Sequence, residues 1–197
     1  MIVNETIPLS GWDWEAAFAP YDDETYQFVV ERLTPQDVVL DIGAGDLRLA
    51  RRLAAIAQQV YAVEKNAAVI VLPTDRLSWP DKLSVIQADA LTWKYPPDVT
   101  VAVLLMRHCT REHFAQIVQR LTAETKCQRL LTNARWKMHV EEMHLRSARS
   151  VPYDPDRVGW YACRCGAVGF TSGDPQAITT QLLADVSEVV NCPACGV

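Results

Sequence analysis

The sequence predicts an α/β protein with a doubly wound, mostly parallel sheet, followed by a small C-terminal β unit built around four cysteines. Three observations lead to this prediction. An apolar run at 38–42 enters a glycine-containing turn at 43–45. Strand-like and helix-like segments alternate from there to about residue 132, as in a sheet whose strands are joined by helices. Two closely spaced cysteine pairs follow, at 163–165 and 192–195.

The first strand and its turn are the most informative segment. It reads Val38-Val-Leu-Asp-Ile-Gly-Ala-Gly45. Its residues Val38, Val39, Leu40 and Ile42 are apolar without alternation, as in a parallel strand covered on both faces. Gly43 and Gly45 permit positive φ and let backbone amides approach a ligand closely. Apolar residues at helical spacing then predict a helix over 47–57. A strand, a glycine turn and a helix N-terminus together form a nucleotide-sized binding site.

The remaining elements follow from the same patterns. Further strands are expected at 60–64, 83–90, 99–106 and 129–132, with helices at 15–33, 66–77 and 111–121. Thr110 is a suitable N-cap for the last of these helices. Pro73 interrupts or ends the helix expected at 66–77. In the C-terminal unit, strands are expected at 159–162, 167–170 and 186–190.

The segment Asp41-Ile-Gly-Ala-Gly45-Asp resembles the first motif of class I S-adenosylmethionine (SAM) methyltransferases. A dinucleotide fingerprint would instead need a glycine at position 48, which is Arg48. The methyltransferase family often has a third glycine where this chain has Leu47. The resemblance covers about residues 20–135 and implies a Rossmann-like methyltransferase fold.

The resemblance also implies a set of cofactor-binding residues. Glu64, at the end of the second strand, is expected to accept hydrogen bonds from the ribose hydroxyls of SAM. Asp89, after the third strand, matches the position that contacts the adenine amino group. The helix expected at 15–33 matches a segment that covers the methionine end, so Tyr21 or Tyr26 is placed to reach it; packing of the helix on the core is the alternative. The implied cofactor site comprises Asp41, Gly43, Gly45, Glu64, Asp89 and Tyr21.

The chemistry is expected after the fourth strand, at Leu105-Met-Arg-His-Cys109. Amino-methylating relatives carry Asn/Asp-Pro-Pro-Tyr/Phe there, and its absence counts against methylation of the exocyclic amine of adenine. His108 is placed to act as a general base, or else packs beside the site. Cys109 lacks the Pro-Cys context of a nucleophile that attacks pyrimidine rings. Arg107 and Asn133 complete the catalytic candidates.

The segment 132–139 is rich in functional side chains. Asn133 is suited to orient a methyl acceptor. Trp136 is suited to stack on a base or another planar group. A polar strand end with a core tryptophan explains the same residues equally well.

The cysteines form two tight motifs, Cys163-Arg-Cys165-Gly and Cys192-Pro-Ala-Cys195-Gly. The second resembles a zinc knuckle, and four thiolates satisfy tetrahedral Zn²⁺ in a structural site. A disulfide or redox pair and an iron–sulfur cluster remain alternatives. We divide the chain into a SAM-binding core at 1–150 and a zinc-ribbon-like extension at 151–197. The extension is expected to be grafted onto a terminal hairpin of the sheet, with 159–170 contributing strands to both; replacement of the hairpin is the alternative.

Composition and charge constrain the function. The chain has 197 residues, is 49% hydrophobic, and has no apolar run near the roughly 20 residues that span a bilayer. Residues 1–10 lack the features of a secretory signal, so a cytoplasmic protein without a membrane partner is expected. Residues 107–164 hold 11 Lys and Arg against 6 Asp and Glu, which suits a phosphate-bearing partner or reflects scattered surface arginines. The sequence pI near 5.4 argues against tight nonspecific nucleic-acid binding.

Taken together, these features predict a SAM-dependent methyltransferase that transfers methyl directly to a macromolecule, with RNA favoured over protein. Two alternatives stay open. One is a non-catalytic SAM-binding or zinc-ribbon interaction module, and the other is a small-molecule methyltransferase. The oligomeric state is not predicted.

Overall fold

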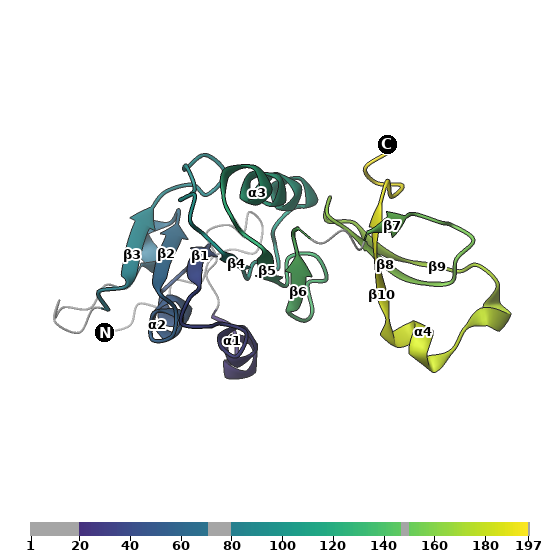
Figure 1. Ribbon diagram of the computed structural model, residues 1–197, viewed down its shortest axis with the longest axis horizontal. Helices are drawn as coiled ribbons and strands as arrows, with labels where there is room; N and C mark the ends of the chain where they lie inside the picture. The colour runs from purple at the N-terminus through teal and green to yellow at the C-terminus, as the bar shows by residue number, and fades with distance from the viewer. Residues whose placement is uncertain (1–19, 71–79, 147–149, 197) are drawn as a thin grey trace, which may run out of the picture.

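Two sheets organise the chain in the computed structural model, which describes residues 20–70, 80–146 and 150–196 (Figure 1). The strand order is β3-β2-β1-β4-β5-β6 in the first sheet and β7-β10-β8-β9 in the second. The first sheet contains β1 (Val38–Ile42), β2 (Gln59–Glu64), β3 (Leu83–Gln87), β4 (Val101–Leu104), β5 (Arg129–Thr132) and β6 (Glu141–His144). Its helices are α1 (Asp23–Val30), α2 (Arg48–Ala54), the 3₁₀ turn η1 (Ala67–Val69) and α3 (Arg111–Glu124). The second part contains β7 (Val151–Pro152), β8 (Gly159–Cys163), β9 (Val168–Thr171), η3 (Pro175–Ala177), α4 (Thr180–Ala184) and β10 (Val186–Val190).

The first sheet is doubly wound, as predicted. Strands β1 to β5 pair in parallel, and β6 pairs antiparallel to β5. Every residue of β1 and β4 is buried, because helices cover both faces of the sheet. Helices α1 and α2 pack into one apolar cluster, and α3 packs into the other. This arrangement brings the carboxyl ends of the parallel strands together at one edge, where α/β sheets bind ligands.

Side-chain caps fix where the helices begin. The Thr110 side chain accepts a hydrogen bond from the backbone N–H of His113, so the predicted N-cap of α3 is confirmed. Asp22 caps α1 in the same way, through Thr25 N–H. Each cap satisfies one backbone donor that the first helical turn leaves unpaired. None of the helices in the described segments has the length and apolar character that crossing a membrane requires.

Several elements are shorter than the sequence predicts. The helix expected at 15–33 is observed as Asp23–Val30, and residues 15–19 lie outside the described residues. The helix expected at 47–57 begins only at Arg48 and ends at Ala54, because Leu47 adopts a left-handed conformation with φ of 68°. Of the helix expected at 66–77, a 3₁₀ turn is observed at Ala67–Val69, and residues 71–79, with Pro73, lie outside the described residues.

The C-terminal strands do not join the first sheet, so the expected graft is wrong. One edge of β8 pairs with β10 and its other edge pairs with β9. No edge of β8 is left for the first sheet, whose own antiparallel edge is the unpredicted β6. The two sheets touch through side chains: Trp136 lies 6.0 Å from Trp160 between ring centroids, and Arg164 Nη2 donates to the carbonyl of His144 at 3.2 Å.

Candidate functional site

A cavity of about 580 Å³ lies where β1, β2 and β4 end. This volume lies within the usual range for small-molecule sites. Of the predicted cofactor residues, those that line the cavity are Tyr21, Asp41, Gly43, Glu64 and Asp89. Lys65, Asn66, Leu91 and His113 also line it and were missed from the sequence. Lys65 and Asn66 follow Glu64 in the chain, and Leu91 follows Asp89 by two residues. Their closeness in sequence to predicted site residues could have identified them.

The glycine turn brings the backbone close to the cavity wall. Gly43 has φ of +73°, and a Cβ built on it would lie 2.8 Å from Met106 Cε. A larger residue would therefore be strained in backbone and side chain alike. The Gly43 and Ala44 N–H groups both donate to the carbonyl of Val63, at 2.9 and 3.1 Å. The turn is thereby tied to the end of β2.

Leu47 occupies the position at which the class I methyltransferases often have a third glycine. Its φ of 68° is the conformation that glycine adopts without cost. Its side chain is fully buried in the cluster formed with α1 and α2. Burial of a leucine side chain contributes about 1.5–3 kcal/mol, which exceeds the cost of the left-handed backbone.

Glu64 closes the glycine turn from the end of β2. Its Oε2 accepts from Gly45 N–H at 2.9 Å, and its Oε1 accepts from Asn66 N–H at 2.7 Å. Gly45 itself is not among the cavity-lining residues. Each carboxylate oxygen has a second acceptor position, so Glu64 remains able to accept hydrogen bonds from a ligand in the cavity.

Asp41 is a buried carboxyl group in the cavity wall. Burial, with the Glu64 charge nearby, raises its pKa to about 7. Among the described residues, none donates a hydrogen bond to Asp41 Oδ2, although this atom is buried. A buried acceptor without a partner is costly. A cationic or hydrogen-bond-donating ligand in the cavity would remove that cost.

Asp89 is held in place after β3. Its Oδ1 accepts from Leu91 N–H at 2.9 Å, and Lys65 Nζ lies 3.3 Å from its Oδ2. The hydrogen bond from Leu91, followed by that from Lys65, keeps the pKa of Asp89 below its usual value. Asp89 is therefore an ionised acceptor at neutral pH.

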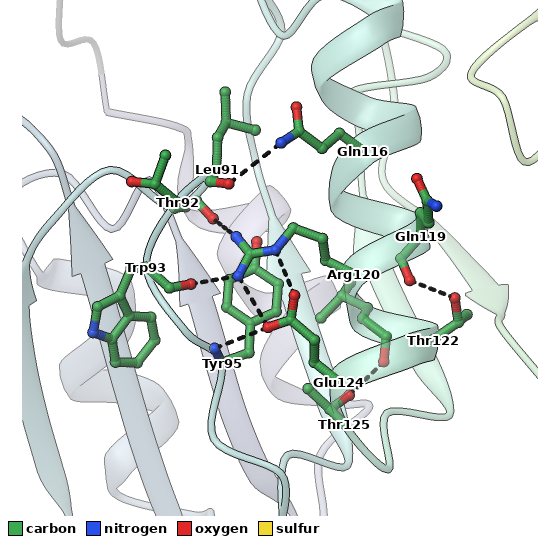
Figure 2. A network of polar contacts seen from close by, with 12 residues as sticks. Leu91, Thr92, Trp93, Tyr95, Gln116, Gln119, Arg120, Thr122, Glu124 and Thr125 are labelled. Carbon is green, nitrogen blue, oxygen red and sulfur yellow. Dashed lines mark hydrogen bonds and ion pairs between the residues drawn. The ribbon is translucent and has the colours of Figure 1, made fainter.

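A hydrogen-bond network with α3 holds the segment that follows Asp89 in the chain (Figure 2). Arg120, on α3, donates to the carbonyls of Ala90 and Trp93, both at 2.6 Å. Its Nε and Nη2 also donate to Glu124, which accepts a further hydrogen bond from Tyr95 N–H at 3.3 Å. The guanidinium carbon lies 4.2 Å from the centroid of the Tyr95 ring. One arginine thus positions both ends of the loop against α3.

The loop after β4 closes the other side of the cavity. Arg107 and His108 are exposed and line the cavity. Tyr21 Oη accepts from Arg107 N–H at 3.2 Å, and the Arg107 guanidinium lies 4.8 Å from the Tyr21 ring centroid. Burial raises the pKa of the Cys109 thiol to about 11, so this thiol is not activated as a nucleophile.

Asn133 lies elsewhere than the sequence suggested. It is buried, it does not line the cavity, and its Oδ1 accepts from Met106 N–H at 2.9 Å. The expectation that Asn133 itself orients an acceptor is therefore corrected. Its amide holds the backbone of the loop that carries Arg107 and His108, which makes it a positioning residue.

Comparison with known families agrees with this geometry. Residues 22–140 match the model of the family described as ribosomal RNA adenine dimethylase, and this span is more than half of the chain. The chain belongs to this family. It is a family of SAM-dependent methyltransferases.

Individual relatives match over shorter segments. A probable ribosomal RNA small subunit methyltransferase A of Methanosarcina acetivorans is 41% identical over 68 residues, which are 34% of this chain and 25% of that protein. A mitochondrial ribosomal RNA small subunit methyltransferase of Arabidopsis thaliana is 38% identical over 74 residues, 36% of this chain and 20% of that protein. The chain therefore spans about a quarter of the length of the curated relatives it matches. The crystal structure of the 23S rRNA methyltransferase ErmE superposes with a TM-score of 0.48 and 25% identity, over 57% of this chain and 46% of that one.

This member of the rRNA adenine dimethylase family has a cysteine cluster beyond the matched residues. The Sγ atoms of Cys163, Cys165, Cys192 and Cys195 all lie within 4.8 Å of one another. Three of the Sγ pairs lie 3.5, 3.5 and 3.9 Å apart. A disulfide requires about 2.05 Å, so none of the four is in one. Burial raises the pKa of Cys163 to about 12.

The second motif forms a tight turn that carries two of the four cysteines. The N–H groups of Cys195 and Gly196 both donate to the carbonyl of Cys192 at 3.1 Å. Burial raises the pKa of Cys192, but the backbone amides of Cys195 and Ala194 outweigh it and lower the pKa to about 7. Amides that stabilise a thiolate in this way are suited to a metal-binding turn.

Proposed function

We propose that the chain binds SAM in the cavity and transfers its methyl group to RNA. The observation that carries this proposal is the convergence of Asp41, Glu64 and Asp89, from three different strand ends, on one cavity. Membership of a SAM-dependent methyltransferase family supports it. The RNA acceptor is supported by the relatives, whose names state that they act on ribosomal RNA.

The residues present fit the proposed cofactor. Asp89 would accept from the adenine amino group and Glu64 from the ribose hydroxyls. Asp41 Oδ2 would meet the positively charged methionine end, which Tyr21 covers. SAM supplies a methyl group already activated on its sulfonium. The chain must then align the acceptor, exclude water and receive the acceptor proton; we assign proton removal to His108 and entry of a phosphate-bearing acceptor to Arg107.

Calorimetric titration with SAM and S-adenosylhomocysteine tests the cofactor. We expect micromolar binding that Glu64→Ala weakens by about 1–3 kcal/mol, as for a lost buried hydrogen-bond acceptor. Glu31→Ala is the matched control, because Glu31 is exposed at the end of α1 and its carboxylate accepts a hydrogen bond from Gln27 on the same helix. Absence of binding by the folded protein would refute the SAM site.

Methyl transfer from labelled SAM to ribosomal RNA, followed by nucleoside analysis, tests the reaction. The family description names adenine, whereas the loop after β4 lacks the Asn/Asp-Pro-Pro-Tyr/Phe motif. The methylated nucleoside found decides between these two indications. We expect His108→Ala and Arg107→Ala to lower the rate without weakening SAM binding. Tight SAM binding without transfer to any RNA would favour a non-catalytic SAM-binding module, which the same departure in the loop supports.

We further propose that the cysteine cluster holds one structural Zn²⁺. Tetrahedral Zn–S bonds of about 2.3 Å place sulfurs about 3.8 Å apart, close to the three short Sγ distances in the cluster. Four thiolates leave no position for a substrate, so the role is structural. We expect one zinc per chain by elemental analysis, lost in Cys192→Ser and kept in Cys127→Ser, a buried cysteine outside the cluster. Iron with visible absorbance would instead indicate an iron–sulfur cluster. The cytoplasmic location stays a prediction.

A further inference from the structure

Four aromatic rings run in a row from the first sheet to the second. His139 stacks on Trp136 with centroids 6.0 Å apart and an interplanar angle of 21°. Trp136 meets Trp160 edge to face at 6.0 Å, and Trp160 meets Phe170 edge to face at 5.0 Å. We name these four residues the aromatic row. It links the segment between β5 and β6 with two paired strands of the second sheet.

The far end of the aromatic row is open to solvent. Trp160 is 38% exposed and Phe170 is 37% exposed. Val186, directly across from Trp160 on β10, is 50% exposed. These three residues are cross-strand neighbours and therefore share one face of the sheet. Exposed aromatic side chains that adjoin one another indicate a binding surface more often than isolated exposed ones do.

The near end is anchored and carries positive charge. Trp136 is half-buried, and its Nε1 donates to Glu141 at 3.2 Å. Glu141, and Glu188 on β10, are both paired with Arg135. Lys137 is exposed and has no carboxylate at ion-pair distance within the described segments. The row therefore lies beside a cation whose charge is not cancelled, which favours a polyanionic ligand.

Lys137, the residue after Trp136 in the chain, connects the aromatic row with the rim of the cavity. Lys137 Nζ donates to the carbonyl of Cys109 at 2.6 Å, and Cys109 lines the cavity beside His108. Lys137 thus lies between the row and the side of the cavity where an acceptor would enter. Nucleotides adjoining an acceptor nucleotide would pass over Lys137 and then over the rings.

We propose that the aromatic row binds unpaired nucleotides next to the methylated position, with bases stacking on Trp160 and Phe170 and a phosphate at Lys137. Sequence-tolerant binding of single strands combines exposed aromatic rings with nearby cations in this way. Base-paired RNA keeps its bases stacked on one another and cannot use the rings. This inference rests on the proposed RNA substrate and adds that the substrate is single-stranded at this point.

Fluorescence anisotropy with a fluorescein-labelled single-stranded oligoribonucleotide, and with the same strand in a duplex, tests the proposal on the full zinc-loaded chain. We expect tighter binding of the single strand. Trp160→Leu and Phe170→Leu should each weaken it by about fivefold or more, the low end of the contribution from stacking one base. Lys137→Gln should weaken binding and reduce its salt dependence.

Conservative and distant variants serve as controls. Trp160→Phe keeps a ring and should retain most of the affinity, whereas a leucine does not. Phe28→Leu removes a ring from α1, on the first sheet, and should leave affinity unchanged. Equal affinity for duplex and single strand, or full affinity in both leucine variants, would overturn the proposal.

The same preparations separate this inference from the proposed function. Calorimetric SAM binding is measured on each variant, and the row lies outside the residues that line the cavity. Loss of oligonucleotide binding with SAM affinity intact supports the role of the aromatic row in RNA binding. Single-strand binding by a chain that never binds SAM would refute the proposed function while supporting this role of the row.

Discussion

Arg135 and Glu188 join the two sheets: Nη1 of the arginine lies 3.0 and 2.9 Å from the two carboxylate oxygens of the glutamate on β10. The same guanidinium binds Glu141 of β6 through Nε and Nη2, at 2.8 and 2.6 Å. The Arg135 side chain is only 2% exposed. One buried cation therefore holds a carboxylate from each sheet.

Replacing Arg135 should destabilise the whole chain. Arg135→Leu leaves two carboxylates near the junction without their partner, and breaking a buried pair in this way costs about 3–5 kcal/mol. Urea unfolding followed by circular dichroism measures the loss. Arg52→Leu removes an exposed pair with Asp23 and should cost at most about 1 kcal/mol. Equal stability of the two variants would show that the junction contributes little.

Asp41 should make stability depend on pH. Its pKa is about 7 in the folded chain, against an ordinary value of 3.8. Between these values the unfolded chain is ionised at this position while the folded chain keeps the proton, so stability falls as pH rises from about 4 to 7 and then levels off. Each unit of pKa difference between the folded and unfolded chain corresponds to about 1.36 kcal/mol, so the free energy of unfolding should fall by roughly 3–5 kcal/mol.

Asp41→Asn removes that titration. Urea unfolding at a series of pH values should show the wild type losing stability relative to Asp41→Asn over this window. Above pH 7 the variant should be the more stable protein. Parallel profiles for the two proteins would place the pKa of Asp41 near its ordinary value.

Gly43→Ala should perturb the cavity through Met106. The left-handed backbone costs an alanine about 1 kcal/mol. The alanine Cβ would lie 2.8 Å from Met106 Cε, so the terminal methyl of Met106 would have to move. We expect lower stability and weaker SAM binding. Met106→Ala in the same chain should recover part of the SAM affinity but none of the backbone cost. A double-mutant cycle measures the coupling; additive effects would mean that the two side chains do not meet.

Arg120→Met should weaken SAM binding from behind the site. The variant frees the carbonyls of Ala90 and Trp93, so the loop that carries Asp89 loses two of its hydrogen bonds to α3 (Figure 2). We expect a Kd about three- to tenfold higher, equivalent to one net hydrogen bond. Gln116→Ala, which removes one longer contact to the same loop at 3.3 Å, is the control. Calorimetry well below the unfolding temperature separates this effect from lost stability.

The sequence predicted the strands of the first sheet better than its helices and edges. Apolar runs identify β1 and β4 because those strands are buried on both faces. Strand β6 has no such pattern: Glu141 and Glu142 head it, and pairing with β5 makes it a strand. The membership of β8 in a separate sheet depends equally on its partners.

The candidate site divides in the same way. Glu64 and Asp89 follow strands directly, so their positions at the carboxyl edge follow from the topology. The role of Asn133 is set by Met106, a neighbour in space that lies 27 residues away in the chain. The Arg120 network is likewise a set of contacts between α3 and a loop about 30 residues earlier. Residue patterns carry no signal for such contacts.

The loop from Leu105 to Cys109 contains neither proline nor glycine, and three side chains from elsewhere hold its backbone. Asn133 binds Met106 N–H, Tyr21 binds Arg107 N–H, and Lys137 binds the Cys109 carbonyl. The conformation of this loop is therefore determined by contacts with residues outside it. Transplanting the five residues into another protein of this fold would move their side chains without their conformation. Conversely, substitutions at positions remote from the loop can change its shape while every residue in it stays the same.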